Sequence, residues 1–168
     1  LVGRTTLPER SEAHQRRGRG RTPRAISACE IQMIPSGAEP RQFAALPFTY
    51  DEGAQLYVLL ITSRRTGRWV LPKGWSEGEE SGPQTAAREA AEEAGVVGQI
   101  TPTDALGSYP YRKAMRDGGS LACRVIVFGL KVEGFQPNFR EKGKRALRWC
   151  SPAYGAELVH EPELASLL

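Results

Sequence analysis

Three carboxylates lie close together in this 168-residue chain, at Glu89, Glu92 and Glu93. Spacings of three and four residues place side chains on one face of an α-helix, within a single turn. Like charges in that arrangement repel each other by roughly 0.2–0.5 kcal/mol per pair, so a helix that carries them invites a divalent cation. Oxygen ligands of this kind favour Mg2+ or Mn2+ over zinc. The spacing therefore predicts a metal site on one face of a helix.

The flanking residues predict where that helix begins and ends. Proline has no N–H to leave unsatisfied in a first turn, so Pro83 fits the start, and Gly95 fits a left-handed position after the last turn. Small side chains on the opposite face would let the helix lie close against a sheet and fix the carboxylates rigidly; these are Ala87, Ala90, Ala91 and Ala94.

Arg88 and the segment before the helix are expected to complete the cluster. Arg88 lies four residues before Glu92, so its guanidinium can hold the carboxylates through charge-assisted hydrogen bonds. The stretch 74–82 is rich in glycine and serine and is predicted to be a loop. Such a loop can bring Glu80 and backbone carbonyls back towards the same ion.

Together these residues resemble the Nudix box. The family pattern is Gly-x5-Glu-x7-Arg-Glu-U-x-Glu-Glu-x-Gly-U, where U is a bulky aliphatic residue, and all its fixed residues are present: Gly74, Glu80, Arg88, Glu89, Glu92, Glu93 and Gly95. Ala90 stands where the family prefers a bulkier side chain, which bears on packing rather than on chemistry. Nine constrained positions within 23 residues make the match a specific one.

The resemblance implies a fold, a reaction and a metal. The fold is of the α+β class, an α/β/α sandwich with a mixed β-sheet between helices. The reaction is hydrolysis of a nucleoside diphosphate linked to another moiety, or of a related pyrophosphate, with Mg2+ as the cofactor and Mn2+ as a possible substitute. Glu89 and Glu93 would be metal ligands, and Glu92 a ligand or the base that activates water.

The resemblance also implies roles for four neighbouring residues. Glu80 would assist the metal through water, and Arg88 would orient the glutamates rather than touch the substrate. Gly74 would offer its backbone to the metal and, with Lys73, would contact the substrate phosphates. Metal ions in such sites polarise phosphoryl oxygens and lower the pKa of bound water.

Outside the box, over about residues 41–168, the chain resembles the diphosphoinositol polyphosphate and dinucleoside polyphosphate phosphohydrolases. That resemblance rests on the segments 42–47, 68–75 and 148–149. Compact substrates with many phosphates need several cationic side chains at the entrance of one active site. The predicted phosphate contacts lie in the hairpin that leads into the box and are Arg64, Arg65, Arg68 and Lys73. Further cations follow at Arg112, Lys113, Arg116, Lys142, Lys144 and Arg145.

Other functions compete with this interpretation. Within the enzymes, the alternatives are removal of the 5′-pyrophosphate from RNA and cleavage of a nucleotide sugar. A Nudix-fold module that senses a nucleotide without turnover is disfavoured, because such modules usually lose box carboxylates that this chain keeps. Trp75 and Tyr109 could stack on a base, although packing is the commoner use of such residues.

The site needs a sheet and helices to position it. Short β-branched and aromatic runs predict strands at 43–50, 56–62, 69–71, about 106–111, 121–132 and 146–150. Helices are expected at 83–94, from Ser151-Pro152 onward, and at 161–168. Strands followed by a helix, more strands and more helices predict a mixed sheet between helical layers.

Composition divides the chain into two parts. Residues 1–40 contain seven arginines and four glutamates and lack apolar periodicity, which predicts a disordered basic leader ahead of a domain at 41–168. An arginine-rich leader could act as a nucleic-acid-binding arm, although its composition fits a solvated tail or an over-extended start site better, and it resembles a targeting segment only weakly. No apolar stretch is long enough to cross a bilayer, and the three cysteines, Cys29, Cys123 and Cys150, form no disulfide or zinc pattern. This use of cysteine suits a reducing compartment, so a cytoplasmic location is expected.

Overall fold

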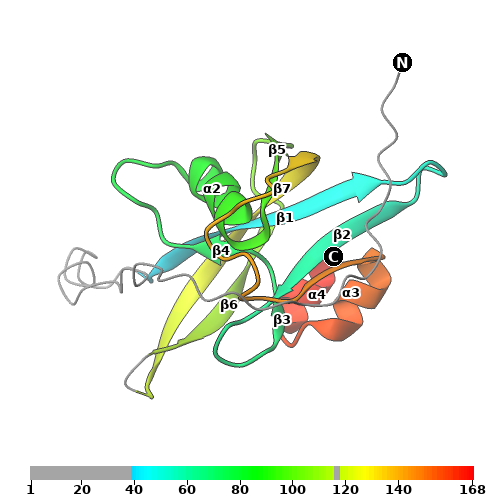
Figure 1. Ribbon diagram of the computed structural model, residues 1–168. Coiled ribbons are helices and arrows are strands. Elements are labelled where there is room, and N and C mark those ends of the chain that lie inside the picture. The colour runs from blue at the N-terminus through cyan, green and yellow to red at the C-terminus, as the bar shows by residue number, and fades with distance from the viewer. Residues whose placement is uncertain (1–38, 116–117) are drawn as a thin grey trace. The chain divides into compact units, whose positions relative to one another are not determined.

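The computed structural model describes residues 39–115 and 118–168. The predicted leader, apart from its last two residues, and Arg116 lie outside the described residues. In chain order the elements are the strands β1 (Arg41–Tyr50), β2 (Leu56–Thr62), β3 (Trp69–Val70) and β4 (Lys73–Gly74), helix α2 (Gly82–Ala94), the strands β5 (Val96–Ile100), β6 (Gly107–Ala114), β7 (Ser120–Phe135) and β8 (Leu147–Cys150), and helices α3 (Pro152–Leu158) and α4 (Pro162–Leu167) (Figure 1).

The sheet is mixed, and its centre is a parallel pair. β1 and β7 run side by side from the Arg41–Arg124 register to the Phe48–Lys131 register. The remaining ladders are antiparallel, and the main path is β3-β2-β1-β7-β5, with β4 on β1, β6 on β7 and β8 on β2. A central parallel pair must be covered on both faces, and this explains why Ala44, Ala45 and Val127 are fully buried.

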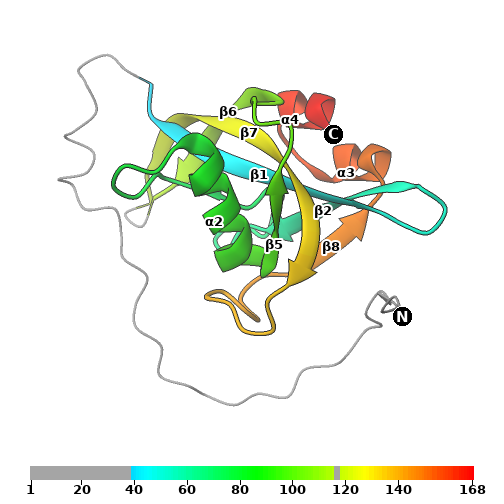
Figure 2. The same cartoon turned by 90° about the horizontal axis from the view of Figure 1, so that it is seen from above.

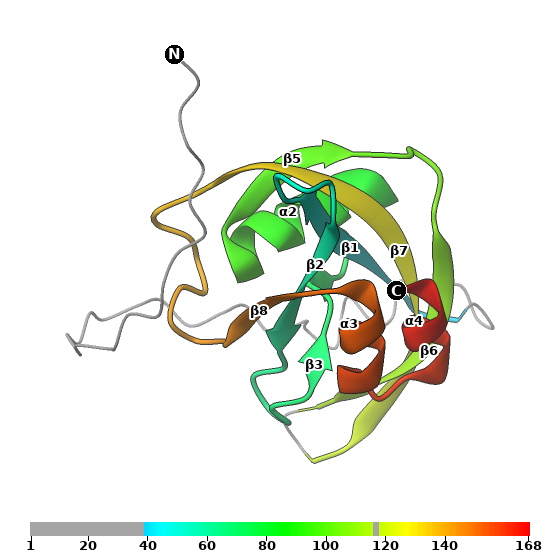
Figure 3. The ribbon, with the colours of Figure 1, turned by 90° about the vertical axis from the view of Figure 1, so that its right-hand side faces the viewer.

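Helix α2 covers one face of the sheet, and α3 and α4 cover the other (Figures 2 and 3). The three layers confirm the predicted α/β/α sandwich with a mixed sheet. Leu164 of α4 is fully buried, and Leu167 packs beside Gly107 of β6, where any larger residue would collide with it. None of the helices that the structure describes is long and apolar enough to cross a membrane.

The ends of α2 are fixed by local chemistry. Ser81 is the N-cap, and its side chain and that of Gln84 form a capping box. Pro83 lies in the first turn, and Gly95 ends the helix in the left-handed conformation with φ 69°. The helix boundaries therefore agree with the sequence prediction to one residue.

The face that α2 presents to the sheet differs from the prediction by one position. The fully buried small residues are Ala86 and Ala90, with Ala94 almost as deep, whereas Ala87 and Ala91 are only half-buried. Positions 86, 90 and 94 are four residues apart and so lie along one face of the helix, whereas the predicted set also contained Ala87 and Ala91. The rotation also buries Glu93 beside the sheet.

Two strands were not predicted. β4 occupies Lys73 and Gly74, the second of which was assigned to a loop, and it pairs with Phe43 and Ala44 of β1. β5 begins directly after Gly95 and pairs with the end of β7 around Phe135. β4 has consequences for the site, because it brings the start of the box against the central sheet.

Candidate active site

Arg88 lies at the centre of the conserved-pattern residues on α2. Its Nε donates to Glu80 at 2.9 Å, one terminal nitrogen donates to Glu89 at 2.8 Å, and the other donates to the carbonyl oxygen of Trp75 at 2.9 Å. Glu92 is farther from the same guanidinium, at 3.7 Å. Arg88 thus fixes two carboxylates and the loop between β4 and α2, in the arrangement expected of an orienting residue.

Glu80 is held from several sides in that loop. Besides the Arg88 contact, its carboxylate accepts hydrogen bonds from the backbone N–H of Glu77 at 3.1 Å and the hydroxyl of Thr85 at 3.2 Å. The hydrogen bond from Arg88 is the main reason that the pKa of Glu80 is lowered. Glu80 is therefore a fixed carboxylate that shares Arg88 with Glu89, and its role towards a metal stays a prediction.

Gly74 makes the closest approach to the carboxylates. A Cβ built on Gly74 would lie 2.0 Å from Oε1 of Glu89, a separation that no side chain tolerates. Because β4 pins Gly74 against Phe43 of β1, the backbone cannot easily move away. The glycine is thus required for a close contact between backbone and Glu89, rather than for an unusual backbone angle.

Glu89 is a buried carboxylate with a like charge beside it. Burial, followed by the charge of Glu93, raises its pKa to about 7, while Arg88 acts in the opposite direction. A carboxylate that is costly to ionise in this way gains from a nearby cation. The donor set, hard carboxylate oxygens that repel each other, therefore suits a divalent ion such as Mg2+.

Glu93 points into a pocket beside the helix. Its Oε2 accepts a hydrogen bond from the backbone N–H of Lys73 at 3.1 Å, and its Oε1 pairs with the guanidinium of Arg145. Burial raises the pKa of Glu93, against the opposing charges of Lys73 and Arg145. The β4 strand and the segment before β8 thus both contact this carboxylate.

Glu92 pairs with a different arginine, Arg140, at 2.6 Å. Each carboxylate that was predicted to bind the metal therefore forms an ion pair with an arginine. Among residues 39–115 and 118–168, no three carboxylate, imidazole or thiol side chains converge on one point as a ready metal cage. The chemistry of the donors fits a divalent ion, whereas their present pairing is with arginines.

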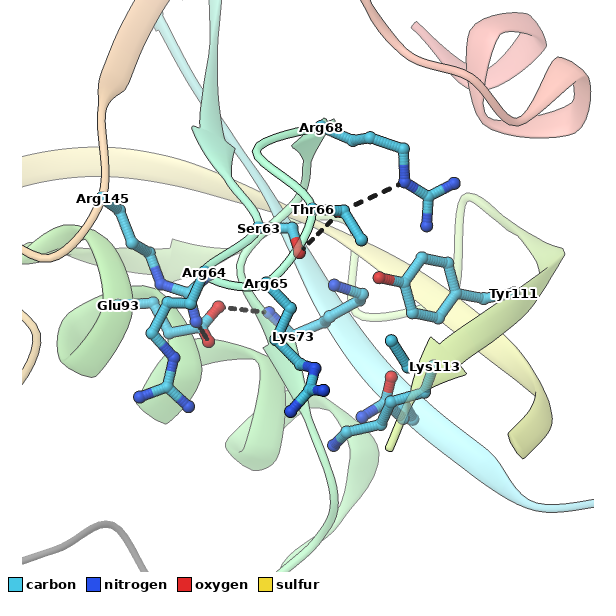
Figure 4. A pocket seen from close by; sticks show the side chains of 12 residues that line it. Ser63, Arg64, Arg65, Thr66, Arg68, Lys73, Glu93, Tyr111, Lys113 and Arg145 are labelled. Atoms are coloured by element: carbon cyan, nitrogen blue, oxygen red, sulfur yellow. Dashed lines mark hydrogen bonds and ion pairs between the residues drawn. The ribbon is translucent and has the colours of Figure 1, made fainter. Parts of the chain in front are cut away.

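The pocket is strongly cationic. Its open volume is about 120 Å3, and it is lined by Gln42, Ser63, Arg64, Arg65, Thr66, Arg68, Lys73, Glu93, Tyr111, Lys113, Ala114 and Arg145 (Figure 4). The lining comes from β1, the β2–β3 hairpin, β4, α2, β6 and the segment before β8. Four of the five predicted phosphate contacts are brought together here, namely Arg64, Arg65, Arg68 and Lys73, whereas Gly74 is not part of the lining.

The pocket cations fall into two groups. Arg64 pairs with Glu141 at 3.1 Å, Arg68 with Glu161 at 3.3 Å, and Arg145 with Glu93 and Glu141. Within the part of the chain that the structure describes, no ion pair is present for the other three, which are Arg65, Lys73 and Lys113. An incoming anion would not have to displace a carboxylate from an ion pair with these three residues, although the charge of Glu93 acts on Lys73.

Aromatic rings line the wall beside these lysines. The Nζ of Lys73 lies 4.5 Å from the ring centre of Tyr111, and that of Lys113 lies 5.2 Å from the ring centre of Trp75. Burial lowers the pKa of both lysines. Tyr109 is fully buried and serves packing, in agreement with the commoner use of such residues.

The sequence identified some of these residues less sharply. Lys113 and Arg145 appeared only within wider groups of cations, and Tyr111 was not singled out. Alternation along β6 is a usable signal, because Tyr111 and Lys113 are two residues apart and therefore face the same side of the strand. The pairing of Arg145 with Glu93 joins residues far apart in the chain and leaves no local pattern.

Known proteins resemble this chain over its folded part. The NUDIX domain model matches residues 40–166. "Nudix hydrolase 16, mitochondrial" from Arabidopsis thaliana is 30% identical over 135 residues, which cover 73% of this chain and 74% of that protein.

Two solved structures have the same fold. One is an Ap4A hydrolase from C. elegans, with a TM-score of 0.54 and 18% identity, over 77% of this chain and 93% of that chain. The other is the NUDIX domain of Shewanella oneidensis NrtR complexed with ADP ribose, with a TM-score of 0.56 and 20% identity, over 84% and 96% of the two chains. Identities this low establish the shared fold and nothing about the ligand.

Proposed function

The chain belongs to the NUDIX domain family, and from that premise we propose that it is a Mg2+-dependent pyrophosphohydrolase acting on a polyphosphorylated small molecule. The substrate class that we favour is that of the diphosphoinositol polyphosphates and diadenosine polyphosphates. The observation that carries the proposal is a box carboxylate, Glu93, in the wall of a pocket whose other charged residues are all cations.

The metal would be held by the carboxylates of α2. Glu89 and Glu93 are the proposed ligands, with Glu92 as a further ligand or as the base, and with Glu80 and the backbone of Gly74 close by. A bound divalent ion supplies charge for the phosphoryl oxygens and a more acidic water. Arg88 fixes Glu80 and Glu89 in place through its hydrogen bonds.

The pocket favours many phosphates over one. Arg65, Lys73 and Lys113 offer three cationic side chains that form no ion pair among the described residues, although the charge of Glu93 also acts on Lys73. Charge-assisted hydrogen bonds to phosphate are about twice as strong as neutral ones. A ligand with several phosphates can satisfy all three charges, whereas a single pyrophosphate bridge held by the metal leaves them unused.

Activity is expected to depend strictly on a divalent ion. Excess EDTA should abolish turnover of a diadenosine polyphosphate, and added Mg2+ should restore it, with Mn2+ tested in parallel. The reason is that the divalent ion would polarise the phosphoryl oxygens and make the attacking water more acidic, which the carboxylates of α2 cannot do by themselves. Full turnover in EDTA would contradict the metal-dependent mechanism, whatever the substrate.

Removal of the unpaired pocket charges should weaken binding of polyphosphates selectively. We expect the double variant Arg65→Gln/Lys113→Gln to raise KM for a diphosphoinositol polyphosphate at least tenfold, since hydrogen bonds to charged groups contribute about 1.5–3 kcal/mol each. KM for ADP-ribose should change little. Arg64 and Arg68 are left intact, because their loss would strand Glu141 and Glu161, which are largely buried.

The matched control is Arg112→Gln/Lys131→Gln, which removes the same number of charges from exposed strand positions outside the pocket lining. Equal effects of the two double variants would show that only the overall charge matters. Equal KM changes for both substrates would remove the support for a polyphosphate and favour a singly bridged pyrophosphate.

A further inference from the structure

Four alternating charges form a row from the box helix to the rim of the pocket. Glu93 of α2 pairs with Arg145, Arg145 also pairs with Glu141 at 2.6 Å, and Glu141 pairs with Arg64 at 3.1 Å. Two members, Glu93 and Glu141, are buried, and Arg64 is partly exposed on the β2–β3 hairpin. The row has no net charge.

Arg145 is the member that touches the most partners. It donates to carboxylates on two different segments and to the carbonyl oxygen of Thr62 at the end of β2, at 2.9 Å. Its side chain is only 7% exposed. An arginine this buried needs all of these acceptors, because an unpaired buried charge is very costly.

Arg145 is therefore built into the fold, yet it also lines the pocket. The hydrogen bonds that Arg145 donates to Glu141 and to the carbonyl oxygen of Thr62 do not involve Glu93. If Glu93 were neutralised by another cation, Arg145 would keep these two partners. The positive charges of Arg145 and Arg64 would then be balanced by Glu141 alone, which leaves one positive charge in excess at the pocket.

We propose that Arg145 is an internal counter-ion of Glu93, which competes with the divalent cation for that carboxylate and turns to a substrate phosphate once the cation is bound. The inference rests on the proposed function, since it takes Glu93 as a metal ligand. It assigns Arg145 a positioning role that links metal binding to anion binding. By linkage, any change that strengthens the ion pair between Arg145 and Glu93 must lower the affinity of the site for the divalent ion.

Two single variants should change metal affinity in opposite directions. Arg145→Gln removes the competitor, so Mn2+ should bind about fivefold more tightly or better. Glu141→Gln removes the second carboxylate, so the charge of Arg145 acts on Glu93 alone and Mn2+ should bind more weakly. The measurement is a titration of the full chain with Mn2+, in which the free ion is counted by electron paramagnetic resonance and no substrate is present.

Two further variants keep this test interpretable. The double variant Arg145→Gln/Glu141→Gln leaves Glu93 and Arg64, so the row stays neutral. It replaces Arg145→Gln if that single variant does not fold, and it too should bind Mn2+ more tightly than the parent. Lys142→Gln removes an exposed charge from the same loop, where its Nζ contacts only the Pro137 carbonyl among the described residues. It should shift Mn2+ affinity less than about twofold, because exposed charges are screened.

The second half of the proposal concerns the phosphate. At saturating Mg2+, Arg145→Gln should raise KM for a polyphosphorylated substrate, whereas Lys142→Gln should not. An unchanged KM would overturn the assignment of Arg145 to phosphate. Weaker Mn2+ binding in both Arg145→Gln and Glu141→Gln would mean that the row merely supports Glu93, and it would overturn the competition.

Failure of the proposed function would look different. If the parent itself bound no Mn2+, Glu93 would not be a metal ligand, and the premise would be lost. If the parent bound Mn2+ and Arg145→Gln bound it equally well, the metal site would stand and the inference about Arg145 alone would be wrong.

Discussion

Glu89→Gln is expected to lose roughly 100-fold or more of the activity and yet to unfold at a higher temperature than the parent in EDTA. Loss of a residue that merely supports a metal ligand costs about 10- to 100-fold, and loss of a ligand should cost more. The gain in stability follows from burial, which raises the pKa of Glu89 to about 7, with the charge of Glu93 adding to the shift.

The sign of the stability change depends on pH. A pKa raised in the folded state means that the folded chain disfavours the ionised carboxylate, so the free energy of unfolding falls as the pH rises from about 4.5 to about 7. Glutamine is neutral at every pH. The advantage of the variant should therefore be absent below about pH 4.5 and complete above pH 7, where it is at most about 3 kcal/mol.

Mg2+ should reverse the order of the two proteins. A ligand that binds only the folded state stabilises it by RT ln(1 + [L]/Kd), and the variant forfeits most of that term. The measurement is a set of thermal melts at pH 5 and pH 8, with EDTA or with Mg2+, run beside the activity assay. A variant that melts well below the parent in EDTA at pH 8 would identify Glu89 as a structural partner of Arg88 instead.

Local signals in the sequence explain why the helix could be predicted well. Pro83 and Gly95 mark its ends by backbone chemistry, and the Ser81–Gln84 capping box is visible in the sequence as well. The spacing of Glu89 and Glu93 depends only on helix geometry. The mixed sheet between helices also followed from the order of strand-like and helix-like segments.

Other features depend on contacts between distant segments and were not predictable in this way. β4 has only two residues and forms because β1 lies beside it. It contains no run of residues with high strand propensity from which it could be predicted. Glu141 is buried in a segment that reads as polar loop, where it joins Arg64 and Arg145. A charged residue in such a segment is usually exposed, so only the folded structure distinguishes it.

The same limit applies to the phosphate-binding residues. The hairpin carrying Arg64, Arg65 and Arg68 leads directly into the box and lines the pocket, but its contact with phosphate stays a prediction. The sequence could not show that Glu141 and Glu161 neutralise two of these arginines. We therefore propose Arg65, Lys73 and Lys113 as the main contacts to the substrate phosphates.

Gly74→Ala should reduce activity about 100-fold while leaving the protein folded. The added methyl carbon would lie 2.0 Å from Oε1 of Glu89, so the carboxylate must swing away from its place beside Arg88. The clash is with the end of a flexible side chain, and Gly74 has an ordinary strand conformation, so the fold can absorb the change. The metal site cannot, because misplacement by about 1 Å is enough to cost 100-fold in rate.

Gly134→Ala is the matched control, because it adds the same atom to a strand glycine of β7 where the nearest neighbour, Cγ2 of Val97, is 3.5 Å away. It should keep parental activity. A double-mutant cycle then identifies the cause: in a Glu89→Gln background, Gly74→Ala should lower activity little further, since both changes disable one carboxylate. Independent, multiplicative losses in kcat/KM would show instead that Gly74 acts on the substrate through its own backbone, and that its contact with Glu89 is incidental.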